Sequence, residues 1–339
     1  MKKINVLEHL SGEEKSKLKK SSLPSWIDPM LATLPHDYFS DENWIFERKL
    51  DGERCLAFCS EGEVRLMSRN KKRLNVHYPE LADELSNQKN EVILDGEVVT
   101  FEGDVTSFSK LQERMRMTSK EEAQASDIDI FYYLFDITYV NGYDTTGLPL
   151  ISRKTLLKEA LDFEDPVRFL SHRDIEGEKY YKEACEKGWE GVIAKRKDSI
   201  YMHKRSTDWL KFKCVNQQEF VIVGYTVPHG ERKGFGALLM GYYEDDRLAY
   251  AGKEGTGYDD ETLRHISDKL APLEVDNPPF ESEDLPHKEV HWVKPELVVE
   301  VGFTEWTKHG KLRHLRYIGL REDKEPEDVM KEQPTEVSP

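Results

Sequence analysis

One lysine in this chain stands in a setting that suits covalent chemistry on phosphorus. Lys49 follows the hydrophobic segment Trp44–Phe46 and precedes Asp51, Gly52 and Arg54. The glycine allows the backbone to approach a bound phosphate with no side chain in between. An amine held at such a point can capture a nucleotide phosphorus atom. The segment therefore predicts a nucleotidyltransferase with Lys49 as its nucleophile.

This amine must be uncharged to react. An ordinary lysine has a pKa of about 10.4 and is protonated at neutral pH. Burial or neighbouring positive charges favour the neutral form. Lys211 and Lys213 are suitable neighbours, because alternate residues of a strand point to one face.

Three carboxylates are candidates for binding a metal ion. Asp95 and Glu97 flank a glycine in the apolar run 92–99, and Glu190 precedes Gly191. A charge inside an apolar run needs a partner, and Mg²⁺ takes one or two such oxygens together with water and substrate phosphates. For each carboxylate alone, the plainer alternative is a solvated side chain at a strand edge.

The hydrophobic pattern predicts an α+β region followed by a strand-rich one. Strands are predicted over 44–49, 54–59, 64–67, 92–99 and 130–140, and helices over 79–86, 152–161 and 175–187. Further strands are predicted over 219–225, 236–243, 248–252, 296–303 and 315–320, with a helix over 259–270. The second group suits a small barrel such as an OB fold.

These patterns divide the chain into four segments. We expect a flexible lead-in over 1–24, an α+β domain over 25–214, a barrel domain over 215–325 and an acidic tail over 326–339. No apolar run approaches the roughly 20 residues that cross a bilayer, and the first residues lack the apolar core of a secretion signal. The expected location is the cytoplasm.

The cysteines fit that location. Cys55, Cys59, Cys185 and Cys214 are too few and too scattered for a disulfide framework, and none forms a Cys-x-x-Cys pair typical of zinc sites. The first two fall on one face of a predicted strand, where they are expected to be buried.

The net charge of −16 argues at first sight against a nucleic-acid partner, because binding to phosphates depends on Lys and Arg. The basic residues are clustered, however, in 69–73, 195–197, 204–205, 232–233 and 308–316. One such cluster is usually a solvated face. Five of them close to candidate site motifs favour a phosphate-binding surface.

The order of the motifs resembles that of ATP-dependent DNA ligases. The matching segments are Glu47-x-Lys49-x-Asp51-Gly52-x-Arg54, Ser68-Arg69-Asn70, Asp95-Gly96-Glu97, Phe135-Asp136, Glu190-Gly191 through Lys195, Lys211-Phe212-Lys213 and Arg321-x-Asp323-Lys324. The resemblance covers about residues 29–324. It is greatest to the ligase domain of bacterial and archaeal ligase D and its stand-alone relatives, through Pro29-Met30-Leu31-Ala32-Thr33 and Gly319 to Lys324.

The resemblance implies a nucleotidyltransferase (adenylation) domain followed by an OB-fold domain, and it assigns a role to each motif. Lys49 would take AMP from ATP as a phosphoramidate. For the nucleoside, the resemblance implies that Glu47 and Arg54 hold the adenosine and that Phe135 stacks on adenine. Arg69 would contact phosphate at the nick, and Glu97 and Glu190 would bind ribose or metal. Lys195, Lys211 and Lys213 would neutralise the α-phosphate, and Arg321 and Lys324 would orient the leaving pyrophosphate when the barrel domain closes. Without the resemblance, Phe135 would be assigned to the core.

The implied reaction is the sealing of nicks in duplex DNA during repair, with ATP as co-substrate and Mg²⁺ or Mn²⁺. The expected partners are nicked DNA and other repair proteins, and the expected state is a monomer. An RNA ligase or a capping guanylyltransferase is an alternative, because the latter shares the Lys-x-Asp-Gly core; Arg54 and the 29–32 segment favour a DNA ligase. A DNA-binding protein with a vestigial nucleotide site is the remaining alternative.

Overall fold

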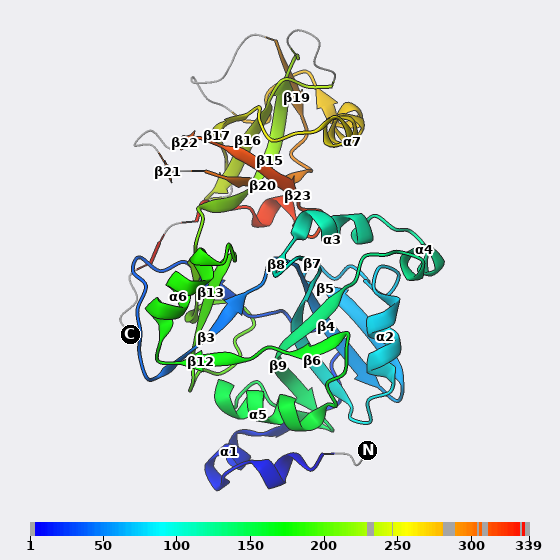
Figure 1. Ribbon diagram of the computed structural model, residues 1–339, viewed down its shortest axis with the longest axis vertical. Coiled ribbons are helices and arrows are strands. Elements are labelled where there is room, and N and C mark those ends of the chain that lie inside the picture. Colours follow the sequence, from blue (N-terminus) through cyan, green and yellow to red (C-terminus); the bar gives the residue numbers. More distant parts are fainter. Residues whose placement is uncertain are drawn as a thin grey trace. The chain divides into compact units, whose positions relative to one another are not determined.

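The computed structural model describes residues 4–228, 234–245, 247–280, 289–303, 305–306, 311–332 and 334–335. The chain divides into two compact units, residues 1–214 with 334–339 and residues 215–333. Each unit has its own hydrophobic core, and Figure 1 shows the elements of both. The basic segment 232–233 and residues 308–310 of the last basic cluster lie outside the described residues.

The first unit contains a large sheet of seven strands in the order β1-β10-β9-β6-β4-β5, with β11 beside β9. Its strands are β1 (Lys19–Lys20), β4 (Glu53–Ser60), β5 (Glu63–Ser68), β6 (Val92–Val99), β9 (Phe131–Val140), β10 (Tyr143–Asp144) and β11 (Val167–Phe169). Helices α2 (Pro79–Ser86) and α5 (Leu150–Ala160) pack against β5 and β9. Because the central strands are covered on both faces, their sequences read as apolar runs.

A small sheet of five strands, in the order β12-β3-β13-β14-β2, completes the first unit. Its strands are β2 (Leu31–Thr33), β3 (Trp44–Lys49), β12 (His172–Asp174), β13 (Gly191–Arg196) and β14 (Arg205–Lys213). One face packs on α6 (Gly177–Glu186) through an apolar cluster that includes Phe46, Val192 and Phe212. The opposite face carries Glu47, Lys49, Lys195, Lys211 and Lys213, which alternate with the residues of that cluster and are therefore directed away from α6.

Shorter elements connect these layers. They are the hairpin β7 (Phe101–Glu102) and β8 (Val105–Thr106) and the helices α3 (Phe108–Met115) and α4 (Lys120–Gln124). Neither helix was predicted from the sequence. Phe108 and Leu111 of α3 are buried in the core of the first unit.

Most of the lead-in is ordered. The 3₁₀ helix η1 (Val6–His9) and α1 (Gly12–Lys17) precede β1, which pairs with β10. Val6 and Leu10 are buried in the core of the first unit. The expectation of a flexible lead-in is therefore wrong for residues 4–20, since two apolar side chains and a strand pairing hold this segment in place.

In the second unit, the long strand β15 (Gln217–Thr226) pairs with β16 along one edge and with β20 and then β19 along the other. The further elements are β16 (Leu238–Glu244), β17 (Arg247–Glu254), α7 (Asp260–Leu270), η2 (Ala271–Leu273), β18 (Glu274–Val275), β19 (Val290–Val293), β20 (Val298–Gly302), β21 (Glu305–Trp306), β22 (Leu312–Arg313), β23 (Arg316–Leu320) and η3 (Pro326–Asp328). Because β15 pairs with two strands, β20 and β19, along the same edge, the sheet can curve around one core, as in small barrels.

The segment after β23 belongs to that core. Val329 is 4% exposed, and its carbonyl accepts a hydrogen bond from the backbone of Tyr243. The side chain of Gln218 donates to the carbonyl of Met330. Residues 326–332 are therefore part of the second unit and not the separate acidic tail that the charge run predicted.

Cys185 of α6 and Cys214 at the end of β14 form a disulfide, whereas Cys55 and Cys59 are buried thiols. The expectation that the four cysteines are too scattered to bridge is wrong for this pair. The two lie 29 residues apart in sequence and meet because α6 packs on the sheet that contains β14.

None of the helices in the described part of the chain is long and apolar enough to cross a membrane.

The bridge predicts a measurable stabilisation of the first unit. Closing a loop of this length restricts the unfolded chain and contributes about 3.6 kcal/mol to the free energy of unfolding. Replacing both cysteines (Cys185→Ser with Cys214→Ser) should lower that free energy by this amount in urea unfolding followed by tryptophan fluorescence. The reduced wild type should match the variant. Identical urea midpoints for the variant and the oxidised wild type would show that the bridge does not form.

Candidate active site

Three rows of residues cross the face of the small sheet that points away from α6. Strand pairing places β13 between β3 and β14, so that each residue from Gly191 to Lys195 has one neighbour on either side. The rows are Lys49, Gly191 and Lys213; Glu47, Ile193 and Lys211; and Ile45, Lys195 and Trp209. Because successive rows are two residues apart, their side chains lie on one face. The first and third rows are about 13 Å apart along the strand.

The first row owes its geometry to Gly191. Its φ of +151° is a conformation that favours glycine, and a Cβ there would lie 1.9 Å from the carbonyl oxygen of Phe212. Glycine therefore lets β13 lie close to the backbone of β14 here, and no side chain stands between Lys49 and Lys213 in this row.

Lys49 is half-buried, and its ammonium group forms a salt bridge with the carboxylate of Glu190. Glu190 directly precedes β13, so its side chain is presented at the end of the first row. The structure thus brings together the predicted nucleophile, one predicted metal ligand and Lys213. The predicted nucleophile therefore lies beside a carboxylate that can accept a proton and in the same row as a second lysine.

Glu47 in the second row is 1% exposed, and its carboxylate is held between two lysines. Lys154 of α5 binds one oxygen, and Lys195 lies 2.6 Å from the other. Burial disfavours the charge of Glu47, but the two cations outweigh it and keep its pKa low. For Lys195, burial dominates and lowers the pKa to about 8.

Lys195 does not lie at the phosphate end of the site. Its ammonium group is 4.0 Å from the ring centroids of both Phe135 and Trp209 and is 2% exposed. It lies four positions after Gly191 along β13. This position argues against the α-phosphate role implied for Lys195.

The large sheet contributes a second charged cluster. Both oxygens of Asp95 on β6 accept hydrogen bonds from Arg54, at 2.5 and 2.6 Å, and one also accepts from the hydroxyl of Tyr201. Arg54 donates further to the carbonyl of Met30. Burial opposes the charge of Arg54, but the attraction of Asp95 outweighs it and raises the pKa of Arg54. Asp95 is 0% exposed and engaged by protein donors, which argues against its predicted metal role.

Phe135 reaches the site through a β-bulge. Asp95 pairs with Asp136 and Gly96 pairs with Leu134, so Phe135 is the extra residue of β9. Such a bulge redirects a side chain. The ring is 6% exposed and contacts Lys195 and the guanidinium of Arg54, the latter at 4.6 Å. Stacking of adenine on this ring, the role implied by resemblance, therefore requires Arg54 or the ring to move.

The remaining predicted residues take separate positions. Glu97 is half-buried and lies opposite Arg54 on β6. Arg69 is half-buried in the turn after β5, where the preceding Ser68 pairs with Cys55 next to Arg54. The roles in ribose and nick binding that the resemblance implies for them stay predictions.

Arg321 and Lys324 belong to the second unit. Arg321 is 8% exposed and pairs with Glu300 and Asp323 at 2.7 and 2.9 Å. Lys324 lies 3.3 Å from Glu219. These ion pairs hold the Arg321–Lys324 motif within the barrel. The role in orienting pyrophosphate that the resemblance implies for this motif stays a prediction.

The carboxylates suit Mg²⁺ only in part. Within the described ranges, no three His, Cys, Asp or Glu side chains converge as a protein-only metal cage requires. Mg²⁺ needs just one or two carboxylates when water and phosphates complete its shell. Glu190, at the phosphate row, fits this arrangement, and Glu97 is the second candidate.

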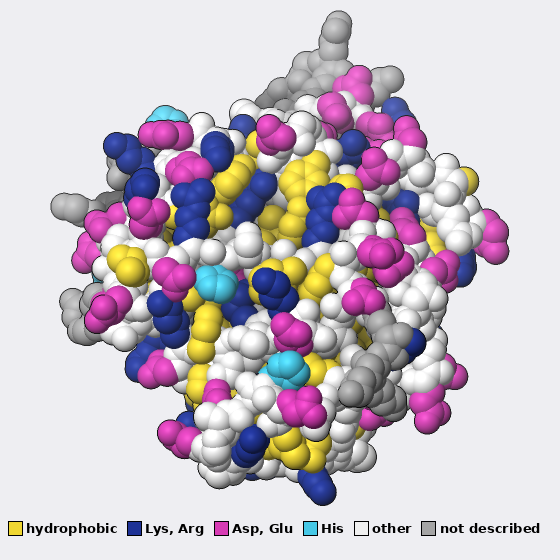
Figure 2. Space-filling model, turned by 60° about the horizontal axis from the view of Figure 1, so that its bottom comes forward, with side chains coloured by type: hydrophobic (Ala, Val, Ile, Leu, Met, Phe, Trp, Pro, Cys, Tyr) yellow, Lys and Arg dark blue, Asp and Glu magenta, His cyan; other side chains and the backbone are white. Residues whose placement is uncertain are grey.

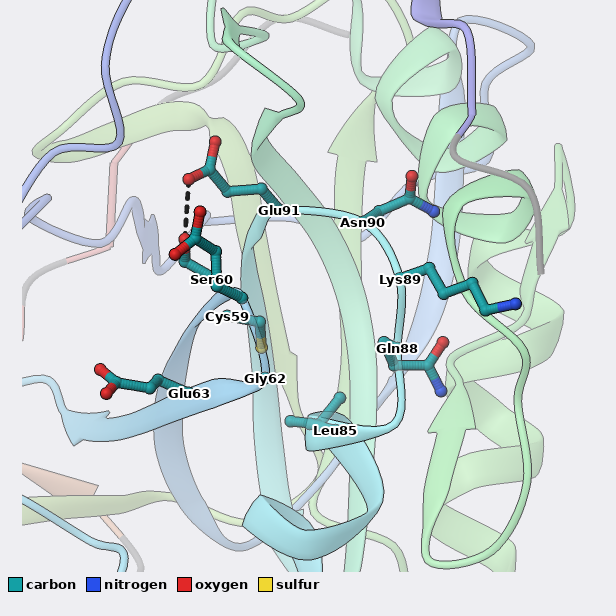
Figure 3. Close-up of a pocket in the computed structure, with 10 residues that line it drawn as sticks. Cys59, Ser60, Gly62, Glu63, Leu85, Gln88, Lys89, Asn90 and Glu91 are labelled. Carbon is teal, nitrogen blue, oxygen red and sulfur yellow. Dashed lines mark hydrogen bonds between the residues drawn. The ribbon is translucent and has the colours of Figure 1, made fainter.

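A cavity of about 490 Å³ lies at the far end of β4 from Arg54, lined by residues 59–63, 85 and 88–91 (Figure 3). Glu61, Glu63 and Glu91 outnumber the single Lys89 in its wall. Such a lining repels phosphate. The cavity is therefore separate from the nucleotide site.

Charge is spread unevenly over the surface despite the net value of −16. Figure 2 shows one face on which Lys and Arg side chains alternate with hydrophobic ones, while Asp and Glu are more frequent near its edge. Local basic surface is therefore available to a polyanion.

Sequence reasoning missed three residues that build the site. Trp209 is two residues before Lys211 on the same strand, so the alternation of side chains along a strand could have shown that it shares a face with Lys211 and Lys213. Tyr201 and Lys154 gave no such signal. They reach the site from a loop and from α5, and Lys154 is 107 residues from the carboxylate that it binds.

Both units of the chain match known protein families. Residues 29–213 match the family described as the ATP dependent DNA ligase domain, and residues 231–324 match the ATP dependent DNA ligase C terminal region. The fold class predicted from the sequence, a nucleotidyltransferase domain followed by an OB-fold domain, is confirmed.

Among individual relatives, the multifunctional non-homologous end joining protein LigD of Pseudomonas aeruginosa is 38% identical over 94% of the chain and 38% of its own length. The LigD protein of Mycobacterium bovis is 37% identical over 90% of the chain and 40% of its own length. The chain thus spans about two-fifths of these relatives. A solved structure of a mycobacterial DNA ligase D complexed with ATP and MES has a TM-score of 0.64 at 36% identity, covering 90% of this chain and 98% of that one.

The buried pair of Arg54 and Asp95 predicts a large effect of a small change. Asp95→Asn keeps the shape but leaves the Arg54 charge uncompensated, so the free energy of unfolding should fall by about 3 kcal/mol. Urea unfolding measures this. The matched control is Asp83→Asn, whose exposed pair with Lys120 should contribute less than about 1 kcal/mol. Equal effects of the two changes would refute the structural role of Asp95.

Proposed function

The chain belongs to the family of ATP-dependent DNA ligases, and on this premise we propose that it seals nicks in duplex DNA through a lysyl-AMP intermediate on Lys49. The observation that supports the proposal most is the row formed by Lys49, Gly191 and Lys213, with Glu190 bonded to the nucleophile. A non-catalytic DNA-binding protein has no need of a lysine, an acid and a second cation around a glycine gap.

In the first step, the Lys49 nitrogen forms a bond to the α-phosphorus of ATP, and the bond from that phosphorus to the bridging oxygen breaks to release pyrophosphate. Glu190 is bonded to the Lys49 ammonium and is placed to accept its proton. Lys213 and Lys211 on β14 neutralise negative charge on the phosphate as it is transferred. Positioning and charge neutralisation are the main requirements of such a transfer.

The next two steps use DNA. The 5′-phosphate at the nick displaces Lys49 from the AMP phosphorus, and the 3′-hydroxyl then attacks the activated 5′-phosphate and releases AMP. The basic turn that starts at Arg69 is the proposed contact for the DNA phosphates. Pyrophosphate orientation is proposed for Arg321 and Lys324.

We propose Mg²⁺ as the metal cofactor, held by Glu190 and Glu97 together with the phosphates of ATP. When bound, it supplies positive charge that offsets the charge of the phosphates. Glu190 would then serve both the metal and the Lys49 ammonium, which couples metal binding to release of the proton.

The biological setting is also a proposal. The names of the LigD relatives refer to non-homologous end joining, so we propose repair of DNA ends, together with other repair proteins, by a monomer in the cytoplasm. A reducing cytoplasm would keep Cys185 and Cys214 largely as thiols. A capping guanylyltransferase is the alternative activity, and labelled ATP against labelled GTP separates the two.

Replacing the nucleophile provides the central test. Lys49→Ala should abolish sealing of a nicked duplex with ATP, because no phosphoramidate can form. The variant should still join DNA that already carries AMP on its 5′-phosphate, since that step does not use the Lys49 amine. A gel assay with a labelled strand measures both reactions.

The control is Lys179→Ala, which removes an exposed lysine of α6 that pairs with Glu176, and it should seal like the wild type. Sealing by Lys49→Ala with ATP and ordinary nicked DNA would contradict the proposal.

The acid beside the nucleophile gives a second test. Glu190→Gln removes the proton acceptor and a metal ligand, so formation of the lysyl-AMP adduct should slow by about 100-fold or more. The Mg²⁺ concentration for half-maximal rate should also rise, whereas the exposed change Glu186→Gln should alter neither value. An unchanged Mg²⁺ requirement in Glu190→Gln would remove Glu190 from the metal site.

A further inference from the structure

Two tyrosines to which the proposed reaction gives no role converge on the backbone of Lys213. The hydroxyl of Tyr38 donates to the Lys213 carbonyl at 3.1 Å, and the hydroxyl of Tyr181 donates to the same oxygen at 3.2 Å. Tyr38 lies in the segment between β2 and β3, and Tyr181 belongs to α6. A carbonyl oxygen has two lone pairs, so each of them has one donor here.

The position of Lys213 at the end of β14 explains why its carbonyl needs side-chain donors. The amide of Cys214 donates to the carbonyl of Glu190 at 3.0 Å, so the backbone of Cys214 is directed to the side on which β13 lies. Backbone groups alternate in direction along a strand, and those of Lys213 therefore point to the other side, where β2 lies. The pairing of β2 with β14 ends at Leu210. The Lys213 carbonyl thus lies beyond the end of the neighbouring strand, and the two tyrosines take the place of a strand partner.

Aromatic packing holds the two hydroxyl groups in place. The ring centroids of Tyr38 and Tyr181 are 4.3 Å apart, and the Tyr38 ring stacks on Phe212 at 4.7 Å. Phe212 is buried in the cluster under α6, whereas the side chain of Lys213 leaves the opposite face of the strand. Burial raises the pKa of Tyr38 to about 12, so its hydroxyl remains a donor at neutral pH. The same aromatic group therefore holds the Phe212 side chain and the Lys213 carbonyl.

We propose that Tyr38 and Tyr181 are positioning residues for the first step of the reaction, and that their hydroxyl groups fix the backbone from which the Lys213 ammonium reaches the transferred phosphate. The inference rests on the proposed function, because it assumes that Lys213 neutralises charge on that phosphate. Lys213 is the last residue of β14, and the second unit begins at Val215. A lysine side chain is long and flexible, so a fixed backbone limits the positions that its charge can take. Misplacement by about 1 Å can slow a reaction about 100-fold.

Removing the hydroxyl groups while keeping the rings tests this role. In the double variant Tyr38→Phe with Tyr181→Phe, kcat for formation of the Lys49–AMP adduct should fall at least about tenfold. KM for ATP should change by less than about twofold, because an interaction made mainly in the transition state affects kcat. Each single variant keeps one donor and should lose less. The rates are measured with the full chain, Mg²⁺ and labelled ATP.

The matched control is Tyr225→Phe, which removes a hydroxyl that donates to Glu274 in the second unit and should leave kcat unchanged. A double-mutant cycle with Lys213→Ala decides whether the two tyrosines act through Lys213. In the Lys213→Ala background, removal of both hydroxyl groups should cause no further loss of rate.

Equal losses of rate with Lys213 and without it would overturn the proposal, because a merely structural role of the tyrosines lowers the rate in both backgrounds. An unchanged kcat in the double variant would overturn it as well. If the double variant is insoluble, the two single variants provide the same comparison. Absence of the adduct in the wild type would refute the ligase reaction and this role together, whereas a wild-type adduct with additive losses would refute only the role of the tyrosines.

Discussion

The register of three neighbouring strands is the constraint on which the site depends. Gly191 of β13 pairs with Lys49 on one side and with Lys213 on the other. Since side chains alternate between the two faces, a slip of one residue would turn these lysines toward α6 and bring Phe46 or Phe212 into the site. The apolar cluster under α6 prevents such a slip, so the core of the small sheet holds the catalytic face in place.

Buried charges are matched group by group in the first unit. Asp95 is paired with Arg54, Asp136 with Arg153, and Glu47 with two lysines. Removing charges from water is costly, so such pairs add little net stability compared with apolar residues. Their value here is geometric: each charged group has one low-energy position, which fixes the donors and acceptors that a nucleotide meets.

Several parts of the fold followed from sequence patterns. The predicted bounds of β3, β6 and α2 agree with the structure, because each is a regular run with clear ends. α3 and α4 were missed, since they are short and polar apart from a few buried residues. The ordered lead-in was missed because its apolar segment is short and the burial of Val6 and Leu10 depends on a distant core.

The sequence by itself determined which residue types are available and which of them share a strand face: Lys49 with Glu47, and Lys211 with Lys213. Period-two alternation is a local property, so it can be read without a structure. Only the tertiary structure decided which strand lies between them, that Lys195 lies at the aromatic end, and that Lys154 and Cys214 find partners far along the chain. Such pairings depend on how helices pack on sheets, and local sequence does not encode that packing.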